Sequence, residues 1–340
     1  MEAHLSGQNK RENNIKILNI VKKFIYLIAA LSFAAVNVSC EKLEEVFVGK
    51  SYVSFSIEAP GVSTRANSIG DGENVDIVYY EIYKNEKGHK NHFEGGKPLI
   101  DGYTKVVGKN AELKVNLLQD QQYVALFWAH VNGNGEKFYN TEDLRKVGVS
   151  YTYVDGNGAA KSAVANDEDR AAFCRRADFG TGDNDDRNVR VELVRPFAQI
   201  NLGTTTESLN LDYEVKLQES KMEIAGAGTV YNVAQMEATA DYTHVIFSFG
   251  AVPGQLLEVG KEFYAYAGMN YILVPANKSS VKLTYDIKTD VGTVNRTVLD
   301  VPVAENHRTN LIGNLLTQET KIEIVVDEKF DGFKNVEVNN

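Results

Sequence analysis

The chain of 340 residues is long enough for two domains, each with its own hydrophobic core. Hydrophobic residues make up 43% and charged residues 24% of the sequence, a composition typical of a folded globular protein that excludes extensive disorder. The formal net charge of -10 argues against nucleic-acid binding, because clusters of Lys and Arg are what bind a phosphate backbone. No nucleic-acid partner is therefore expected.

A basic pair followed by an apolar run marks the N-terminal segment. Lys22 and Lys23 precede the apolar residues 24–36. A helix of that length spans about 20 Å, which is too short for a hydrocarbon core of about 30 Å. The pattern therefore predicts a secretory signal peptide over residues 1–39 rather than a permanent membrane span. The segment before Lys22 is long for a signal peptide, so the true translation start stays open.

Cys40 directly follows the small residue Ser39 and resembles the lipobox cysteine of bacterial lipoproteins, whose thiol is acylated. Asn37 stands where that pattern favours Leu, so ordinary signal cleavage with Cys40 left as a free thiol is the alternative. We expect a lipid on Cys40, a charged tether over residues 40–50, and anchoring in the cell outer membrane. In lipoproteins of anaerobic gut and oral bacteria a similar charged patch accompanies display on the outer surface. Cys174 then has no disulfide partner and is interpreted as a small buried hydrophobe.

Alternation of apolar and polar residues predicts strands from residue 52 onward. The first strand covers residues 52–59, and the residues on its apolar face are Val53, Phe55, Ile57 and Ala59. Further strands are predicted at 77–83, 111–117, 123–130, 151–154, 189–202, 213–217, 245–249, 263–266, 271–274, 281–287, 293–301 and 321–326. Only residues 141–147 and 165–172 indicate helix, and both helices would be short.

This series of strands predicts an all-β fold of two β-sandwich domains in tandem. Parallel α/β folds are excluded, because no long helices alternate with the strands. Residues 180–188 form the sharpest break in composition, so we place the domain boundary there. The predicted domains are 51–185 and 186–333, followed by a C-terminal tail over 334–340.

The sequence carries no local catalytic motif, since it lacks a His-Glu-x-x-His pair, a Gly-x-Ser-x-Gly elbow, a phosphate-binding loop and a dinucleotide fingerprint. We expect neither an enzyme nor a cofactor, although a catalytic site assembled from distant loops would leave no such motif. His89 and His92 form a close pair, but their Lys-rich surroundings indicate a solvated loop rather than a metal site. The acidic run 183–188 has Val194 where a calcium loop needs Glu, so no metal is expected.

Several stretches resemble the fimbrillin-like (type V pilin-like) lipoproteins of anaerobic Gram-negative gut and oral bacteria. The stretches are the lipobox at Cys40 with the loop 63–66, residues 69–72 leading into 75–83, residues 191–202, and residues 301–303 with 306–316. The resemblance implies two transthyretin-like or immunoglobulin-like β-sandwiches. It also implies polymerisation by donor-strand exchange after a protease removes the first strand.

Under this resemblance the exchanged strand is residues 52–59, and Arg65, in a polar loop just beyond it, is the expected cleavage point. Removing an edge strand would expose an apolar groove with unpaired backbone groups, which a strand of the next subunit could refill. The alternative is that Arg65 is an ordinary surface residue. The implied partners are other pilin subunits and an Arg-specific protease.

The function expected from the sequence is that of a surface lipoprotein acting as a structural or adhesive subunit of a fimbrium-like assembly. Shaft, tip, anchor and non-polymerising roles all stay open. The alternative is a monomeric outer-membrane lipoprotein that binds a glycan or a host ligand through its loops.

Overall fold

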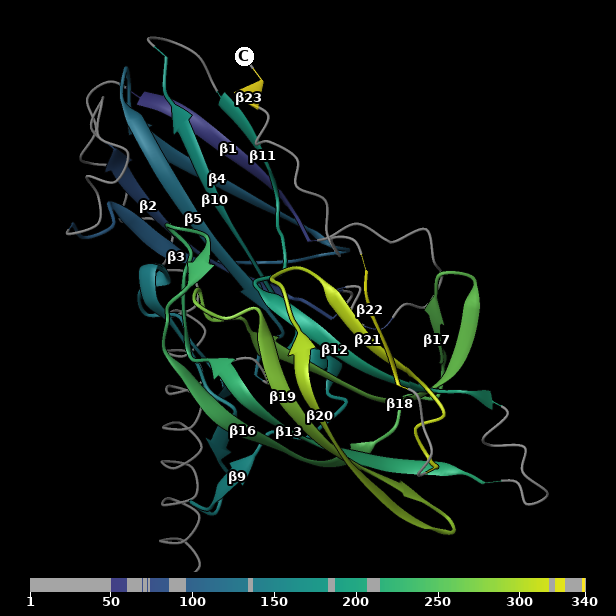
Figure 1. Cartoon of the computed structure of the whole chain (residues 1–340). Helices are drawn as coiled ribbons and strands as arrows, with labels where there is room; N and C mark the ends of the chain where they lie inside the picture. The colour runs from purple at the N-terminus through teal and green to yellow at the C-terminus, as the bar shows by residue number, and fades with distance from the viewer. Residues whose placement is uncertain are drawn as a thin grey trace, which may run out of the picture. The chain divides into compact units, whose positions relative to one another are not determined.

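The computed structural model describes residues 50–59, 69, 72, 74–85, 96–133, 137–182, 187–206, 215–317, 322–327 and 338–339. The regular secondary structure of these residues is almost entirely strand, so the prediction of an all-β fold is confirmed (Figure 1). The described part of the chain includes no helix with the length and apolar character of a membrane span. The predicted signal peptide, Cys40 and Arg65 lie outside the described residues.

The elements named below follow one another in chain order, and within the described residues they include the 3-10 helices η3 and η4. The strands of the first half are β1 (Lys50–Glu58), β2 (Ile77–Asn85), β3 (Ile100–Lys105), β4 (Asn110–Leu118), β5 (Gln122–His130), β6 (Tyr139–Asn140), β7 (Val147–Val149), β8 (Thr152–Val154), β9 (Ala160–Ser162), β10 (Ala172–Gly180) and β11 (Arg187–Glu192). Those of the second half are β12 (Phe197–Thr204), β13 (Leu217–Gly228), β14 (Val230–Asn232), β15 (Glu237–Ala238), β16 (Tyr242–Ala251), β17 (Leu256–Val259), β18 (Glu262–Leu273), β19 (Ser280–Thr289), β20 (Gly292–Pro302), β21 (Arg308–Gly313), β22 (Glu323–Val326) and β23 (Val338–Asn339). The helices are η3 (Leu144–Lys146) and η4 (Glu168–Arg170).

Two four-stranded sheets form the first sandwich, with strand orders β23-β11-β1-β4 and β10-β5-β2-β3. Their facing side chains meet around Phe55 of β1. The ring of Phe55 packs edge-on against Phe127 of β5 and Phe179 of β10, with centroids 5.4 and 5.2 Å apart. Edge-to-face contacts of this kind add to the energy gained by burying the rings.

A nine-stranded sheet forms the second half and follows the path β20-β19-β13-β18-β12-β21-β22, with β16 beside β13 and β17 beside β18. β13 and β18 pair only at Gly228 and Leu273, at one end of both strands. Away from that end they face each other across the core, because a Cβ on Gly268 of β18 would lie 2.8 Å from the Cε of Met222 on β13. The sheet thus turns a corner and covers its own apolar face.

Trp128 lies where the two halves of the fold meet. Its indole is fully buried and contacts the rings of Tyr139, Phe197 and Tyr231, at centroid distances of 5.5, 6.4 and 6.1 Å. A small sheet of order β15-β14-β7-β6 also joins the halves, since β7 pairs with β14. Strands from both halves therefore share one continuous core.

Residues 163–171 run from the first half onto the second, and we call this segment the strap. Its Val164 forms a parallel bridge with Ser248 of β16. Asn166 has a left-handed φ of 65° and directs its side chain into the second half. Its Nδ2 donates to the Ser220 hydroxyl and to the carbonyls of Gly250 and Ala251, at 3.0, 3.1 and 3.0 Å. Its Oδ1 accepts the backbone N–H of Met269 at 2.7 Å.

Near the end of the strap lies Arg170, whose side chain is 1% exposed. The guanidinium lies over the rings of Phe138, Tyr151 and Phe247, at 4.3, 5.2 and 5.3 Å from their centroids. None of its three nitrogen atoms has a hydrogen-bond partner among the described residues. Cation–π contact therefore helps to hold this buried charge, together with its electrostatic interaction with the carboxylate of Asp167.

The predicted domain boundary at 185/186 stays a prediction, but the strand pairing on either side of it is informative. β11 follows the boundary in sequence and pairs in parallel with β1 of the first sandwich. The nine-stranded sheet begins only with β12, at Phe197.

Candidate functional site

β1 contains the residues for which the sequence predicts a role in assembly. Its buried side chains are Val53, Phe55 and Ile57, and Ala59, which directly follows the strand, is also buried. The side chain of Tyr52 is half exposed on the opposite face. This separation follows from the period of two in a strand, which sends successive side chains to opposite faces.

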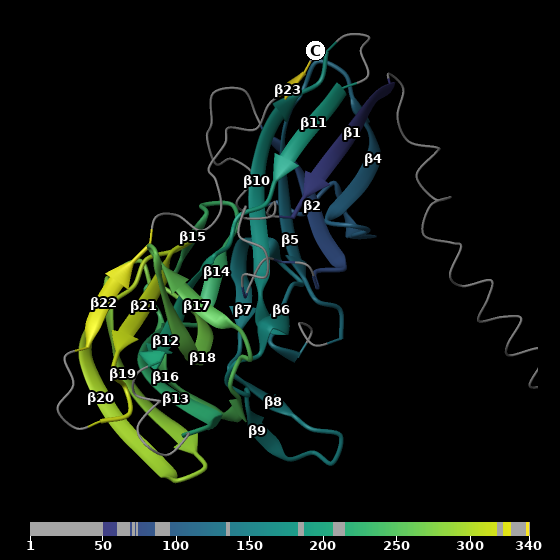
Figure 2. The same ribbon diagram turned by 90° about the vertical axis from the view of Figure 1, so that its right-hand side faces the viewer.

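β1 is an interior strand, with β11 on one side and β4 on the other (Figure 2). It runs parallel to β11, in a register that aligns Val53 with Arg187 and Glu58 with Glu192. The expectation that residues 52–59 form an edge strand is therefore wrong. Alternation shows which face of a strand is buried, but it does not show how many neighbours the strand has.

The end of β1 is held by contacts on both sides. The N–H of Ala59 donates to the carbonyl of Lys109, and the N–H of Leu193 donates to the carbonyl of Glu58, both at 2.9 Å. On the solvent face Arg190 pairs with Glu58 at 2.8 Å and with Glu192 at 3.3 Å. Partly exposed ion pairs of this kind contribute little to stability, so the buried face dominates.

The surroundings of β1 are suited to binding an extended polypeptide strand. Removing β1 would leave β11 and β4 each with a row of unpaired backbone N–H and C=O groups. Between those rows would lie the slot now filled by Phe55, walled by Phe127 and Phe179. An added strand could satisfy the backbone groups and place alternate side chains in the slot.

No group of three or more His, Cys, Asp or Glu side chains within the described residues is placed to hold a metal ion. His89 and His92, and the acidic residues 183–186, lie outside the described residues. Cys174 is a buried thiol in β10. The expectations of no metal, no cofactor and no catalysis stay predictions.

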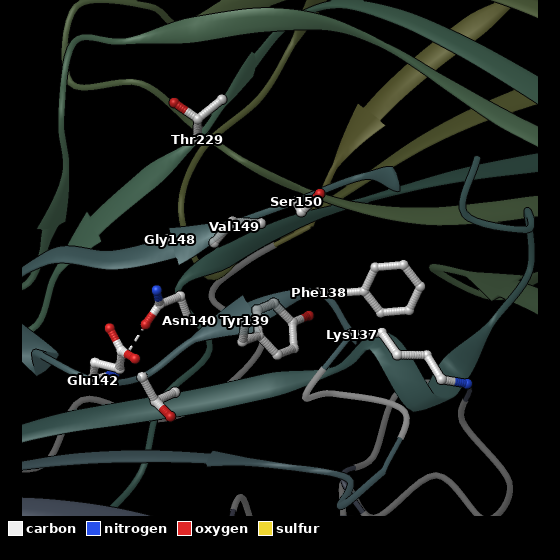
Figure 3. A pocket seen from close by; sticks show the side chains of 10 residues that line it. Lys137, Phe138, Tyr139, Asn140, Glu142, Gly148, Val149, Ser150 and Thr229 are labelled. Atoms are coloured by element: carbon white, nitrogen blue, oxygen red, sulfur yellow. Dashed lines mark hydrogen bonds between the residues drawn. The ribbon is translucent and has the colours of Figure 1, made fainter. Parts of the chain in front are cut away.

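Two surface hollows lie on either side of β7, and the sequence analysis did not predict them. The first, of about 540 Å³, is lined by residues 137–142, 148–150 and Thr229 (Figure 3). The second, of about 350 Å³, is lined by 149–152, Ser162, Thr229 and 243–246. Val149, Ser150 and Thr229 line both hollows, and we call the two hollows together the groove.

Local hydrogen bonds shape the walls of the groove. Asn140 Oδ1 accepts the backbone N–H of Glu142 at 3.0 Å (Figure 3). Burial raises the pKa of Tyr151 to about 12, so this hydroxyl stays protonated. It donates to the carbonyl of Gly228 at 3.0 Å and accepts the N–H of Leu273 at 3.1 Å. The groove is thereby fixed to the corner of the second sandwich, where β13 meets β18.

No sequence motif could have indicated the groove, because its lining comes from five separate stretches of the chain. The residues have ordinary surface character when each stretch is taken alone. The pairing of β7 with β6 and β14, and the bridge between Val164 and Ser248 of β16, bring these stretches together.

Fold and site together define an all-β protein in which β1 is an interior strand with one apolar face and a surface groove lies beside β7. The chain belongs to the family described as a family of unknown function (DUF6562), which matches residues 45–339. No curated protein matches the chain.

The chain is also similar to solved structures of bacterial proteins. A candidate cell adhesion protein from Bacteroides ovatus is 10% identical, with a TM-score of 0.48, and the match covers 85% of this chain and 100% of that one. A fimbrial assembly protein from Parabacteroides distasonis is 13% identical, with a TM-score of 0.42 and coverage of 85% and 99%. A candidate adhesin from Bacteroides thetaiotaomicron is 14% identical, with a TM-score of 0.46 and coverage of 82% and 97%. Similarity at this level carries no argument about function.

Proposed function

We propose that the protein is a surface lipoprotein that serves as a structural or adhesive subunit of a fimbrium-like assembly. In this proposal the chain is anchored in the outer membrane through a lipid on Cys40 and is not an enzyme. Proteolysis after Arg65 removes β1, and a strand from a neighbouring subunit takes its place.

The observation that carries the proposal is the place of β1 in the first sandwich. Its inward side chains Val53, Phe55 and Ile57 are almost fully buried, and it has a strand on each side. Losing it would therefore open a slot with both an apolar floor and two rows of backbone hydrogen-bonding groups. Such a slot accepts an extended strand with alternating side chains and rejects most other ligands.

The assembly step is tested with the lipid-free chain starting after Cys40, incubated with an Arg-specific protease. We expect cleavage after Arg65, followed by ladders that resist SDS, because a strand inserted on both edges dissociates slowly. The matched control is Arg65→Lys, which keeps the charge and removes the cleavage site. Cleaved protein that stays monomeric, or ladders that also form from Arg65→Lys, would reject strand exchange.

The anchor is tested separately in cells fed a labelled palmitate analogue. The wild-type chain should carry the label and fractionate with the outer membrane, whereas Cys40→Ala should carry none. Equal labelling of both proteins would show that Cys40 is not the acylated residue.

A further inference from the structure

Strand β16 has a neighbouring strand on one side only. Among the described strands it pairs with β13 (Figure 1). On its other side the strap forms a single parallel bridge, between Val164 and Ser248. Residues 242–246, at the start of β16, therefore have an open edge within the part of the chain that the structure describes.

The hydrogen bonds of Ser248 indicate which backbone groups point to this open edge. Its N–H donates to the carbonyl of Ala163 at 2.8 Å, and its carbonyl accepts the N–H of Ala165 at 2.9 Å. Alternate residues of a strand send their backbone groups to the same side. The groups that face the open edge therefore belong to Tyr242, His244 and Ile246. The carbonyl of His244 accepts a 3.4 Å hydrogen bond from the Thr243 hydroxyl, which leaves its second lone pair for another donor.

The side chains of the same three residues are exposed. Tyr242 is 55% exposed, Ile246 is 42% exposed, and the imidazole of His244 is 55% exposed. The ammonium of Lys278 lies 4.0 Å from the centroid of the Tyr242 ring, and Nε2 of His244 lies 2.9 Å from a carboxylate oxygen of Glu223. Proteins commonly protect an open edge with lysine or proline, and residues 242–246 contain neither. This edge is therefore suited to the addition of another strand.

Two features of the fold limit how an added strand can lie. β16 begins at Tyr242, and the strap occupies the edge at Ser248, so the added strand can pair only with residues 242–246. If that strand is the same segment of a second copy running antiparallel, the midpoint His244 lies on a twofold axis. Tyr242 of each copy then lies opposite Ile246 of the other, and aromatic pairs with β-branched residues stabilise a sheet. The segment is thus complementary to itself.

The second hollow of the groove lies beside the same segment. It borders residues 243–246 and is lined on its other sides by residues 149–152, Ser162 and Thr229. In the antiparallel register Thr243 of one copy lies opposite Val245 of the other, on the face where Val245 is buried. A hollow of about 350 Å³ can take side chains of this size from the second copy.

We propose that two copies of this chain form a symmetric dimer through antiparallel pairing of β16, with His244 on the twofold axis. Backbone hydrogen bonds between residues 242–246 of the two copies continue the sheet across the dimer. Each imidazole keeps the Glu223 of its own copy as its partner, so the two rings meet without an uncompensated charge. The dimer does not depend on strand exchange, because β1 takes no part in it.

The dimer is tested by sedimentation velocity over a range of concentrations, with the lipid-free chain starting after Cys40. This chain carries Arg65→Lys, so that the proposed cleavage cannot contribute to association. We expect a dimer that dissociates on dilution. Ile246→Lys should weaken it by about tenfold or more, because the change occurs twice in each dimer and places lysine on the edge.

The matched control is Leu299→Lys, which replaces another exposed apolar residue on the edge strand β20. It should dimerise like the parent chain, and circular dichroism should show all the proteins folded. A monomer at every concentration would overturn the proposal and leave the open edge to a strand of another protein. Unchanged dimerisation of Ile246→Lys, or loss of the dimer in Leu299→Lys alone, would overturn it as well.

The register is tested by disulfide cross-linking. Cys174, the remaining cysteine of this chain, is buried. His244→Cys should give a covalent dimer under mild oxidation, because residues directly opposite in an antiparallel pair have Cα atoms about 5.5 Å apart, within reach of a disulfide. Ile246→Cys should give none, since the two copies of residue 246 lie about 13 Å apart along the strands. Cross-linking of Ile246→Cys in place of His244→Cys would contradict the proposed pairing.

Discussion

His130 illustrates how burial alone sets the properties of a residue in this fold. It ends β5 and is fully buried, with its ring stacked on Tyr79 at 5.4 Å and close to Tyr139. Neither ring nitrogen has a hydrogen-bond partner among the described residues. Burial lowers the pKa of His130 from its ordinary value of 6.5 to about 4, with the charge of Asp76 opposing that shift. The imidazole is therefore neutral at physiological pH.

We predict that His130 makes the protein less stable in mild acid. Because the pKa is lower in the folded state, the unfolded state binds the extra proton, so this residue's contribution is retained above pH 6.5 and is lost as the pH falls toward 4. The loss should reach about 3 kcal/mol. Urea unfolding at pH 7 and pH 4.5 should show a smaller pH dependence for His130→Phe than for wild type. Identical pH dependence of the two proteins would contradict the prediction.

Single residues with long-range partners were the least predictable from sequence. The burial of Phe55 follows from the alternation around it. The buried Arg170 does not, because a guanidinium between short polar runs normally indicates a surface position. Its aromatic neighbours Phe138, Tyr151 and Phe247 come from three different strands or loops. Only the tertiary fold brings them together.

At the scale of elements, strands with clear alternation, such as β4, and strands with a continuous apolar run, such as β5, were predicted close to their observed bounds. The apolar stretch 189–202 was predicted as one strand but forms two. β11 ends at Glu192, and β12 starts at Phe197 in a different sheet. Pro196 lies in the gap, and proline lacks the N–H that a continuous ladder needs. A local apolar pattern cannot show that a chain changes sheets.

The two stretches predicted as short helices became 3-10 turns. In the first, η3 covers Leu144–Lys146, and Asp143 accepts the N–H of Arg145 at its start. In the second, η4 covers Glu168–Arg170 and gives way directly to β10. Helix-forming residues were present in both stretches, but sheet pairing on the C-terminal side ended each helix after three residues.

A mutation in β1 tests how much of the first sandwich depends on this strand. Phe55→Ala should lower the free energy of unfolding by about 3–5 kcal/mol, because it leaves a cavity beside Phe127 and Phe179. The control is Ser54→Ala on the opposite face, which should change stability by less than about 0.5 kcal/mol. Both values come from urea unfolding. Equal losses for the two variants would show that the buried face does not dominate the strand's contribution.

At the scale of the whole molecule, the strap joins the two halves into one body. Besides the Asn166 side-chain contacts, the N–H of Ala165 donates to the carbonyl of Ser248 at 2.9 Å, and the N–H of Ser248 donates to the carbonyl of Ala163 at 2.8 Å. Gly250 lies against this segment so closely that an added Cβ would overlap the carbonyl oxygen of Ala165. The absence of a side chain at Gly250 is therefore what allows the strap to lie on β16.

We predict that Gly250→Ala weakens the junction between the halves. The new methyl group must displace the backbone of the strap, which should cost about 1–3 kcal/mol. Amide hydrogen exchange at Ala165 should accelerate in the variant, because its bond to Ser248 is disturbed. The matched control is Gly254→Ala, where an added Cβ would meet no atom within 4 Å. If both variants exchange at the wild-type rate, the close approach at Gly250 does not hold the strap.

The parallel pairing of β1 with β11 has a consequence for the order in which the chain folds. Parallel neighbours cannot be joined by a tight hairpin. On the β11 side, the backbone groups of β1 have no partner until the chain has reached Arg187, which pairs with Val53. Contacts between such distant parts of a chain form slowly. In a polypeptide that emerges with its N-terminus first, β1 is thus the earliest of the described strands to appear, and it gains its second neighbour only after residues 187–192 have been made.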